Sequence, residues 1–300
     1  MENNMKISSN IPLRDCLAVL AVIALALMIV FPAASTARSG GKLALCLSNL
    51  HLLGRAWMAY QEDNDSWLVG LSTERASIVD ESTTTWGTPY RWVEYPLYTP
   101  VYGSTPVASY AECNLTYQLN GVQAGKLFAY TQNVQVYHCP NDKYWLTKSY
   151  APWISYYGSG CMNGEDYTAR NGMNITGFRS VTLPSRQAKQ LVCVNKYNQI
   201  KNPAGRFTFI EEDYADHNQW RCVGSFVTMG SGYWSWWDWP AWYHNGSNTL
   251  GFADGHAENH AWQDPRTLDL MRNGSLTDHT VQTDNKDIVY FNNGYVPAGW

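Results

Sequence analysis

The stretch HNGSNTLGFADGHAENHAW, residues 244–262, decides much of the fold. Residues 249–252 are apolar and favour a strand, Asp254-Gly255 is a dipeptide typical of tight turns, and a second strand pattern continues to Trp262. We therefore expect a β-hairpin in which Gly255 adopts a positive φ. His244, directly before Asn-Gly, is expected to support the hairpin, so His244, Asp254 and Gly255 are given structural roles.

Polar side chains alternate along the second half of this hairpin. They are Asp254, His256, Glu258 and His260. Residues two apart on a strand share a face, and carboxylates with imidazoles on one face are a donor set for a divalent metal. The same alternation is typical of any half-exposed strand, and this second interpretation is favoured. We expect no metal, and name these four residues as the candidates for one.

A second predicted strand, residues 206–210, runs into an acidic cluster formed by Glu211, Glu212 and Asp213. Such a cluster at a strand end is either a solvated terminus, which is the favoured interpretation, or a calcium site. Residues 264–300 are rich in polar and turn-forming residues, so we expect a tail that returns to the surface.

The N-terminal stretch CLAVLAVIALALMIVFPAA, residues 16–34, contains no charged residue. Nineteen helical residues extend about 28 Å, close to the thickness of the hydrocarbon core of a membrane. The pattern predicts a transmembrane helix. A cleaved signal peptide, with the small residues 35–37 at the cleavage site, is the alternative. A buried helix of a soluble core is disfavoured because the stretch has no polar face.

An amphipathic continuation of this helix is predicted over residues 39–65. Its apolar positions repeat at spacings of three and four residues: Leu43, Cys46, Leu50, Leu53, Trp57 and Tyr60. Pro32 and the pair Gly40-Gly41 predict a kink or a melted turn. The resulting domain division is 1–38 (leader and membrane or assembly helix), 39–65 (amphipathic continuation) and 66–300 (globular β-rich head).

Composition restricts the class of protein. Of the 300 residues 45% are hydrophobic and only 15% are charged, with a net charge of −4, which argues for a folded core and against nucleic-acid binding. Seven cysteines occur without a metal-binding spacing. The six that follow Cys16 suggest disulfides, and six cysteines allow fifteen pairings. No common catalytic motif occurs, so we do not expect an enzyme.

Aromatic residues concentrate in the segment YWSWWDWPAWY, residues 233–243. Three interpretations stay open: a surface that stacks on sugar rings, a contact between subunits, or a small hydrophobic core beneath a loop. The candidate ligand surface consists of Trp234, Trp236, Trp237, Trp239 and Trp242.

Several of these motifs together resemble a known family, the bacterial type IV pilin-like proteins (pseudopilins) with a C-terminal H-x9-DG domain. His244 is followed by nine residues and then by Asp254-Gly255, and the block CPND at 139–142 is similar to the Cys-Pro-Ser-Asp of the family. The segment FTFIEE at 207–212 and the half-helix around Cys46 are also similar. Asn10 stands where the prepilin cleavage signal has glycine.

The resemblance implies an α+β fold, in which a long N-terminal (trans)membrane helix packs on a pilin-like antiparallel β-sheet head with long loops. It implies a structural subunit of a fibre or a secretion pseudopilus, as in type IV pili or type II secretion, that self-assembles through its N-terminal helix. The expected location is a single-pass inner-membrane protein with its head in the periplasm, or an extracellular filament. The alternative is a membrane-anchored or secreted module that binds polysaccharide through the Trp-rich surface.

The resemblance also implies roles for single residues. Asp15 matches the glutamate that pairs with a neighbouring subunit during assembly, with Arg14 of a neighbour as its substitute partner, and Pro32 matches the proline of the helix kink. A disulfide between Cys46 and Cys139 would tie the helix to the head. Proximity in the sequence then leaves the pairs Cys113–Cys161 and Cys193–Cys222.

Overall fold

The computed structural model describes residues 13–71, 90–108, 112–146, 152–163, 176–182, 188–212, 225–228, 234–236, 238–273 and 281–297. For 13–19, 21–38, 176–182 and 188–192 it describes the backbone alone. The helices are α1 (Leu13–Asp63), α2 (Leu115–Ala124), α3 (Phe128–Thr131), α4 (Pro265–Asn273) and α5 (Lys286–Tyr295), and the strands are β1 (Tyr156–Gly158), β2 (Thr176–Thr182), β3 (Ala188–Val194), β4 (Phe207–Glu211), β5 (Ser247–Phe252) and β6 (Ala257–Ala261).

The main sheet is antiparallel and has the strand order β1-β4-β5-β6, while β2 and β3 pair in a separate two-stranded sheet. Every residue of β4 and β5 is buried, because layers cover both faces of these central strands. Antiparallel strands combined with helices make the fold α+β, as the sequence predicts.

The predicted hairpin is formed by β5 and β6, which pair from Ser247 opposite Ala261 to Gly251 opposite Ala257. At its turn the N–H of Gly255 donates to the carbonyl of Phe252. Gly255 has a φ of +88°, a value that side chains other than glycine adopt only with strain. The predictions for the hairpin and for Gly255 are confirmed.

Helix α1 is one unbroken helix of 51 residues. Gly40 and Gly41 are helical, so the predicted melted turn is wrong. The propensity cost of two glycines, about 1 kcal/mol each, is local and does not stop a helix that continues on both sides. The chain divides into two compact units, Met1–Lys42 and Leu43–Trp300, and the second is called the head below.

No helix among the described residues is both long enough and apolar enough to cross a membrane. This finding overturns the predicted transmembrane helix and the predicted single-pass inner-membrane location. From Ser39 onward, where the side chains of α1 are described, Lys42, Arg55 and Glu62 interrupt the apolar residues. That is the pattern of an amphipathic helix that packs on a protein core. The side chains of 16–34 other than Leu20 lie outside the described residues.

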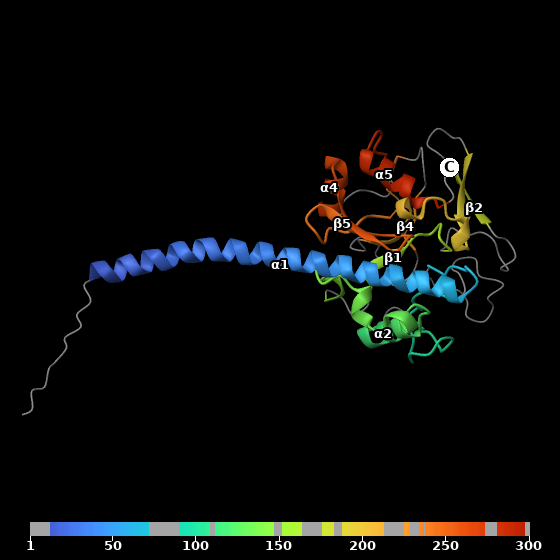
Figure 1. Cartoon of the computed structure of the whole chain (residues 1–300), viewed down its shortest axis with the longest axis horizontal. Coiled ribbons are helices and arrows are strands. Elements are labelled where there is room, and N and C mark those ends of the chain that lie inside the picture. The colour runs from blue at the N-terminus through green and yellow to red at the C-terminus, as the bar shows by residue number, and fades with distance from the viewer. Residues whose placement is uncertain are drawn as a thin grey trace, which may run out of the picture. The chain divides into compact units, whose positions relative to one another are not determined.

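Within the head, α1 packs one apolar stripe on the main sheet (Figure 1). Cys46, Leu50, Leu53 and Trp57 of the predicted repeat are fully buried, and Tyr60 is nearly so. The contact includes a close approach of backbones, because a Cβ atom added at Gly54 would lie 2.9 Å from the Cα of Gly255.

Helix α5 covers the opposite face of the sheet (Figure 1), where the ring of Phe291 stacks on Phe207 of β4. Ile288 and Tyr295 of α5 are also buried. The prediction of a surface tail over 264–300 is therefore wrong for its described residues. The apolar residues of the segment 264–300 are few, but those of α5 recur on one side of the helix and complete the core.

Candidate functional site

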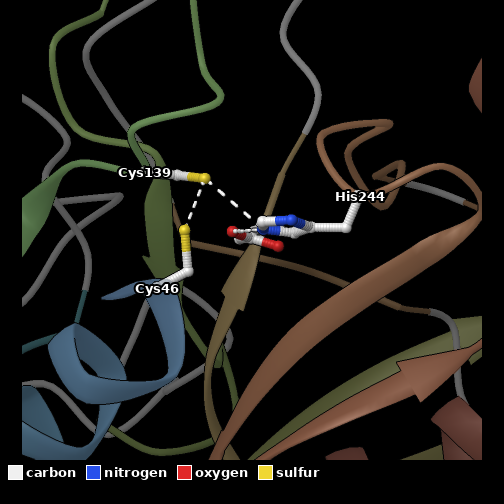
Figure 2. A group of neighbouring side chains, drawn as sticks. Cys46, Cys139 and His244 are labelled. Carbon is white, nitrogen blue, oxygen red and sulfur yellow. Dashed lines mark hydrogen bonds and ion pairs between the residues drawn. The ribbon is translucent and has the colours of Figure 1, made fainter. Parts of the chain in front are cut away.

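Four polar side chains from separate parts of the chain converge inside the head. Cys46 comes from α1, Cys139 from the connection after the short 3-10 helix Val134–Tyr137, Glu211 from the end of β4 and His244 from the loop before β5. Their sulfur, nitrogen and oxygen atoms all lie within 4.8 Å of one another. We call these residues the four-residue cluster, and Figure 2 shows both thiols and the imidazole of His244 directed toward one another.

Short contacts connect the members of the cluster. The sulfur atoms of Cys46 and Cys139 are 2.8 Å apart, and Nε2 of His244 lies 3.5 Å from the sulfur of Cys139 and 3.0 Å from Oε1 of Glu211. The side chain of His244 is 3% exposed and that of Glu211 is 0% exposed. The cluster is therefore an internal site, screened from water.

The turn that carries Cys139 is held by its own hydrogen bonds. The N–H of Cys139 donates to Oγ of Ser155, and the Ser155 hydroxyl donates to Asp142. The N–H of Asp142 returns to the carbonyl of Cys139. The block CPND is thus a closed turn that fixes the position of the Cys139 thiol.

Glu211 and His244 are positioned from the sheet. The N–H of Thr249 in β5 donates to Oε2 of Glu211, which leaves Oε1 for His244. Directly after His244, Asn245 and Gly246 both have positive φ values, 53° and 89°. The Asn-Gly pair therefore turns the chain sharply into β5 and directs the imidazole inward.

The electrostatics of the cluster favour a charged histidine. Burial by itself lowers the pKa of His244, but hydrogen bonds to Cys139 and Glu211 and the charge of Glu211 raise that pKa to about 10. Burial raises the pKa of the Cys139 thiol, and it also raises the pKa of the Tyr156 hydroxyl, which lies beside Cys46. These shifts favour a protonated thiol at Cys139 and a charged imidazole at His244 beside Glu211.

Cys46 and Cys139 face each other, as the resemblance implied, but no disulfide joins them in this structure. Their disulfide stays a prediction. The pair assigned by proximity, Cys113–Cys161, is wrong, because Cys161 contacts Cys193, with 2.7 Å between the sulfurs. The cause is the pairing of the chain after β1 with the end of β3, where the N–H of Val194 donates to the carbonyl of Cys161. Cys222 lies outside the described residues.

The acidic cluster at the end of β4 is not a solvated terminus. Glu211 and Glu212 are both buried, because they lie at the end of β4, a central strand of the main sheet. The carboxylate of Glu211 contacts the imidazole of His244. Asp213 lies outside the described residues. The favoured interpretation of this cluster is therefore wrong.

The candidate metal ligands of the hairpin have other partners. His256 pairs with Asp254, Glu258 accepts a hydrogen bond from the hydroxyl of Tyr290, and His260 stacks on the Tyr290 ring. Among the described residues, the one group of three or more close metal-binding side chains is the four-residue cluster.

The Trp-rich segment contributes mainly to the core. Trp236 and Trp239 are buried, and Trp236 meets the edge of Trp262. Trp234 is half-buried, as is Trp242, which lies under the guanidinium of Arg272, and Trp237 lies outside the described residues. The buried rings cannot stack on a sugar.

The assembly residues inferred from the resemblance, Arg14, Asp15 and Pro32, belong to α1, but their side chains lie outside the described residues.

Sequence reasoning singled out all four members of the cluster but separated them into three sites: a disulfide, a hairpin support and an acidic strand end. The signal that joins them is the chemistry of the side chains, two thiols with one imidazole and one carboxylate. No protein-family model, curated protein or solved structure matches this chain.

Proposed function

We propose that this chain is a structural subunit that assembles with copies of itself into a filament through α1. The observation that carries the proposal is the length of α1. Its 51 residues extend about 77 Å, whereas the compact head begins only at Leu43. The residues before Leu43 that the structure describes belong to this single helix.

An apolar helix needs a cover in water. Residues 16–34 carry no charge, and Leu20, whose side chain is described, is 61% exposed in the single chain. Burial of such side chains against one another is favourable by about 25 cal/mol per Å². The same segment of a second copy is a suitable cover, because it offers an equally apolar surface along an equal length. The resemblance to pilin-like subunits supports the same arrangement.

The head suits this role because it holds the C-terminal part of α1 firmly. Both the four-residue cluster and the turn at Gly255 contact α1, so a load on the helix is transmitted to the sheet. A filament subunit needs such a connection between its assembling segment and its folded body.

The test compares filament assembly of the full wild-type chain with that of two variants, each of which introduces one arginine at a different position. Leu20→Arg introduces a charge in the apolar part of α1, and Val281→Arg introduces the same charge at a head position that is 54% exposed. Wild type and Val281→Arg should form filaments visible by negative-stain electron microscopy and sedimenting at high speed. Leu20→Arg should remain in the supernatant.

Filaments that form equally well with Leu20→Arg would contradict the proposal. So would a wild-type chain that stays monomeric at every concentration while its head is folded.

A further inference from the structure

We propose that the four-residue cluster is a zinc site that fastens α1 to the head. This inference concerns the interior of the head and does not depend on filament assembly. Cys46 is the one member of the cluster on α1, whereas Cys139 and His244 come from two connections of the head and Glu211 comes from the end of β4. A metal ion held by all four would cross-link segments that are far apart in the sequence.

The donor set matches zinc. Structural zinc sites take four ligands in a tetrahedron, chiefly cysteine thiolates and histidine nitrogens and also carboxylate oxygens, at about 2.0–2.3 Å. Neighbouring donors in such a tetrahedron are about 3.3–3.8 Å apart. The 3.5 Å between Cys139 Sγ and His244 Nε2 agrees with that spacing, and the 3.0 Å between Nε2 and Glu211 Oε1 is slightly shorter.

Two kinds of distance have to change when the metal enters. The two sulfurs are 2.8 Å apart and must separate by about 1 Å, whereas the widest separation of ligand atoms in the cluster, up to 4.8 Å, must shorten by about 1 Å. Cys139 lies in a turn rather than in a helix or strand, and rotation about its Cα–Cβ bond moves its sulfur without moving α1.

The surroundings of the cluster complete a metal site. Oε2 of Glu211 is already held by the N–H of Thr249, which leaves Oε1 for the metal. The amide of Asn141 lies 3.2 Å from Nδ1 of His244. When Nε2 binds a metal, Nδ1 carries the proton, and a turn of the Asn141 amide presents its carbonyl to accept that proton, as partners of metal-bound histidines do.

A buried hydroxyl lies beside one of the two sulfurs. Tyr156 is 0% exposed, and its hydroxyl interacts with the side chain of Cys46. A hydrogen bond to a charged acceptor is stronger than a hydrogen bond to a neutral one. A zinc-bound thiolate of Cys46 is therefore a better partner for this buried hydroxyl than a thiol is.

The proton balance of binding follows from the two states. In the zinc-bound cluster both sulfurs are thiolates and Nε2 of His244 carries no proton. The protons that leave these ligand atoms when one Zn²⁺ binds go to the solvent, and no oxidant or reductant takes part.

Cys161 and Cys193 provide a matched control within the same protein. They are also buried and have sulfurs 2.7 Å apart, but among the described residues no histidine or acidic side chain completes a group of three donors around them. A zinc ion that bound to any close cysteine pair would occupy both places, whereas the proposed site needs His244 and Glu211.

The experiment uses the full-length protein, reduced and freed of metal and then titrated with Zn²⁺ and Co²⁺. We expect one zinc per chain by elemental analysis. We also expect the intense visible and near-ultraviolet absorption of tetrahedral, thiolate-bound cobalt. Cys139→Ser should abolish both signals, Asn141→Leu should weaken zinc binding about 10–100-fold, and Cys193→Ser should leave both unchanged.

The cobalt spectrum of wild type is decisive even if a ligand variant does not fold. A reduced, folded wild-type chain that binds no zinc and shows no thiolate–cobalt absorption overturns the proposal. The proposal is also overturned if the isolated protein contains a Cys46–Cys139 disulfide and binds no zinc after that disulfide has been reduced. Zinc that is lost in Cys193→Ser but retained in Cys139→Ser places the site elsewhere and has the same consequence.

Discussion

The two ends of β5 hold α1 in different ways. At its start, His244 belongs to the four-residue cluster and contacts the sulfur of Cys139, which in turn contacts Cys46 of the helix. At its end, the turn at Gly255 lies directly against the helix backbone at Gly54, and Nδ1 of His51 lies 3.0 Å from the carbonyl oxygen of Gly255. The spacing of the H-x9-DG pattern is therefore the length of one strand that meets the same helix twice.

The difference teaches which conditions each contact responds to. The contact at Gly255 depends on the close approach of two glycine backbones, together with the hydrogen bond of His51, and so responds chiefly to steric changes. The contact at His244 depends on protonation, redox state and metal occupancy, because each of these changes the charge of buried groups. The predictions below separate the two ends.

The largest effect is expected from His244→Leu, tested in reduced protein with a chelator present. Leucine preserves much of the volume but leaves the carboxylate of Glu211 buried without its cationic partner. Breaking a buried ion pair on one side costs about 3–5 kcal/mol, and urea denaturation should report a free energy of unfolding lower by that amount.

The matched control for His244→Leu is the double variant with Glu211→Gln, which removes the buried charge as well. It should recover part of the lost stability. A single variant that loses less than about 1 kcal/mol would show that the pair is not the main support of this end of β5.

The other end of β5 is tested by Gly54→Ala, with Gly41→Ala as the control on the same helix. At Gly54 the new methyl group would lie 2.9 Å from the Cα and carbonyl oxygen of Gly255, whereas at Gly41 no atom lies within 4 Å. Overpacking costs about 1–3 kcal/mol, and a helix favours alanine over glycine by about 1 kcal/mol. Thermal unfolding should show loss of stability for Gly54→Ala and none for Gly41→Ala. Equal effects would refute the close approach.

Gly255→Val tests the turn itself. Space is available, since the added Cβ would lie 3.6 Å from Met58, but the φ of +88° is strained for a β-branched residue. We expect a loss of about 1–3 kcal/mol. Gly255→Asn should lose less, because asparagine tolerates positive φ better. A valine variant as stable as wild type would mean that the hairpin adopts another turn.

The turn end of β5 was predictable and the cluster was not. The Asp-Gly turn, the paired strands and the buried stripe of α1 are local patterns, in which each residue's role follows from its near neighbours in the sequence. The tail that becomes α5 was missed because its apolar residues are sparse and acquire meaning only against Phe207.

The four-residue cluster depends on contacts across long sequence separations. Cys46 and Cys139 are 93 residues apart, and Glu211 and His244 are 33 apart. Spacing rules for metal sites detect ligands close in sequence, so they do not apply here. The burial of Glu211 was also unpredictable, because a run of acidic residues at a strand end is ordinarily solvated.

The smallest effect is expected at His260, which pairs in register with Asn248 near the His244 end of β5. Burial between Tyr290 and Trp262 lowers the pKa of His260, and the charges of Asp287 and Glu258 oppose this only in part. The unfolded chain, with an ordinary pKa of about 6.5, therefore binds the proton first as the pH falls. Stability is complete above that pH and is lost as the pH falls toward the folded pKa.

His260→Asn removes the titrating group and should reduce the loss of stability between about pH 8 and about pH 5. Burial also lowers the pKa of His138, to about 4, and His138 is present in both proteins. The stability of the variant therefore still depends on pH, and its slope against pH has to be compared with the slope of wild type. Urea midpoints across the pH range give the two slopes. Parallel slopes would mean that His260 is solvated and that its stacking on Tyr290 does not shield it from water.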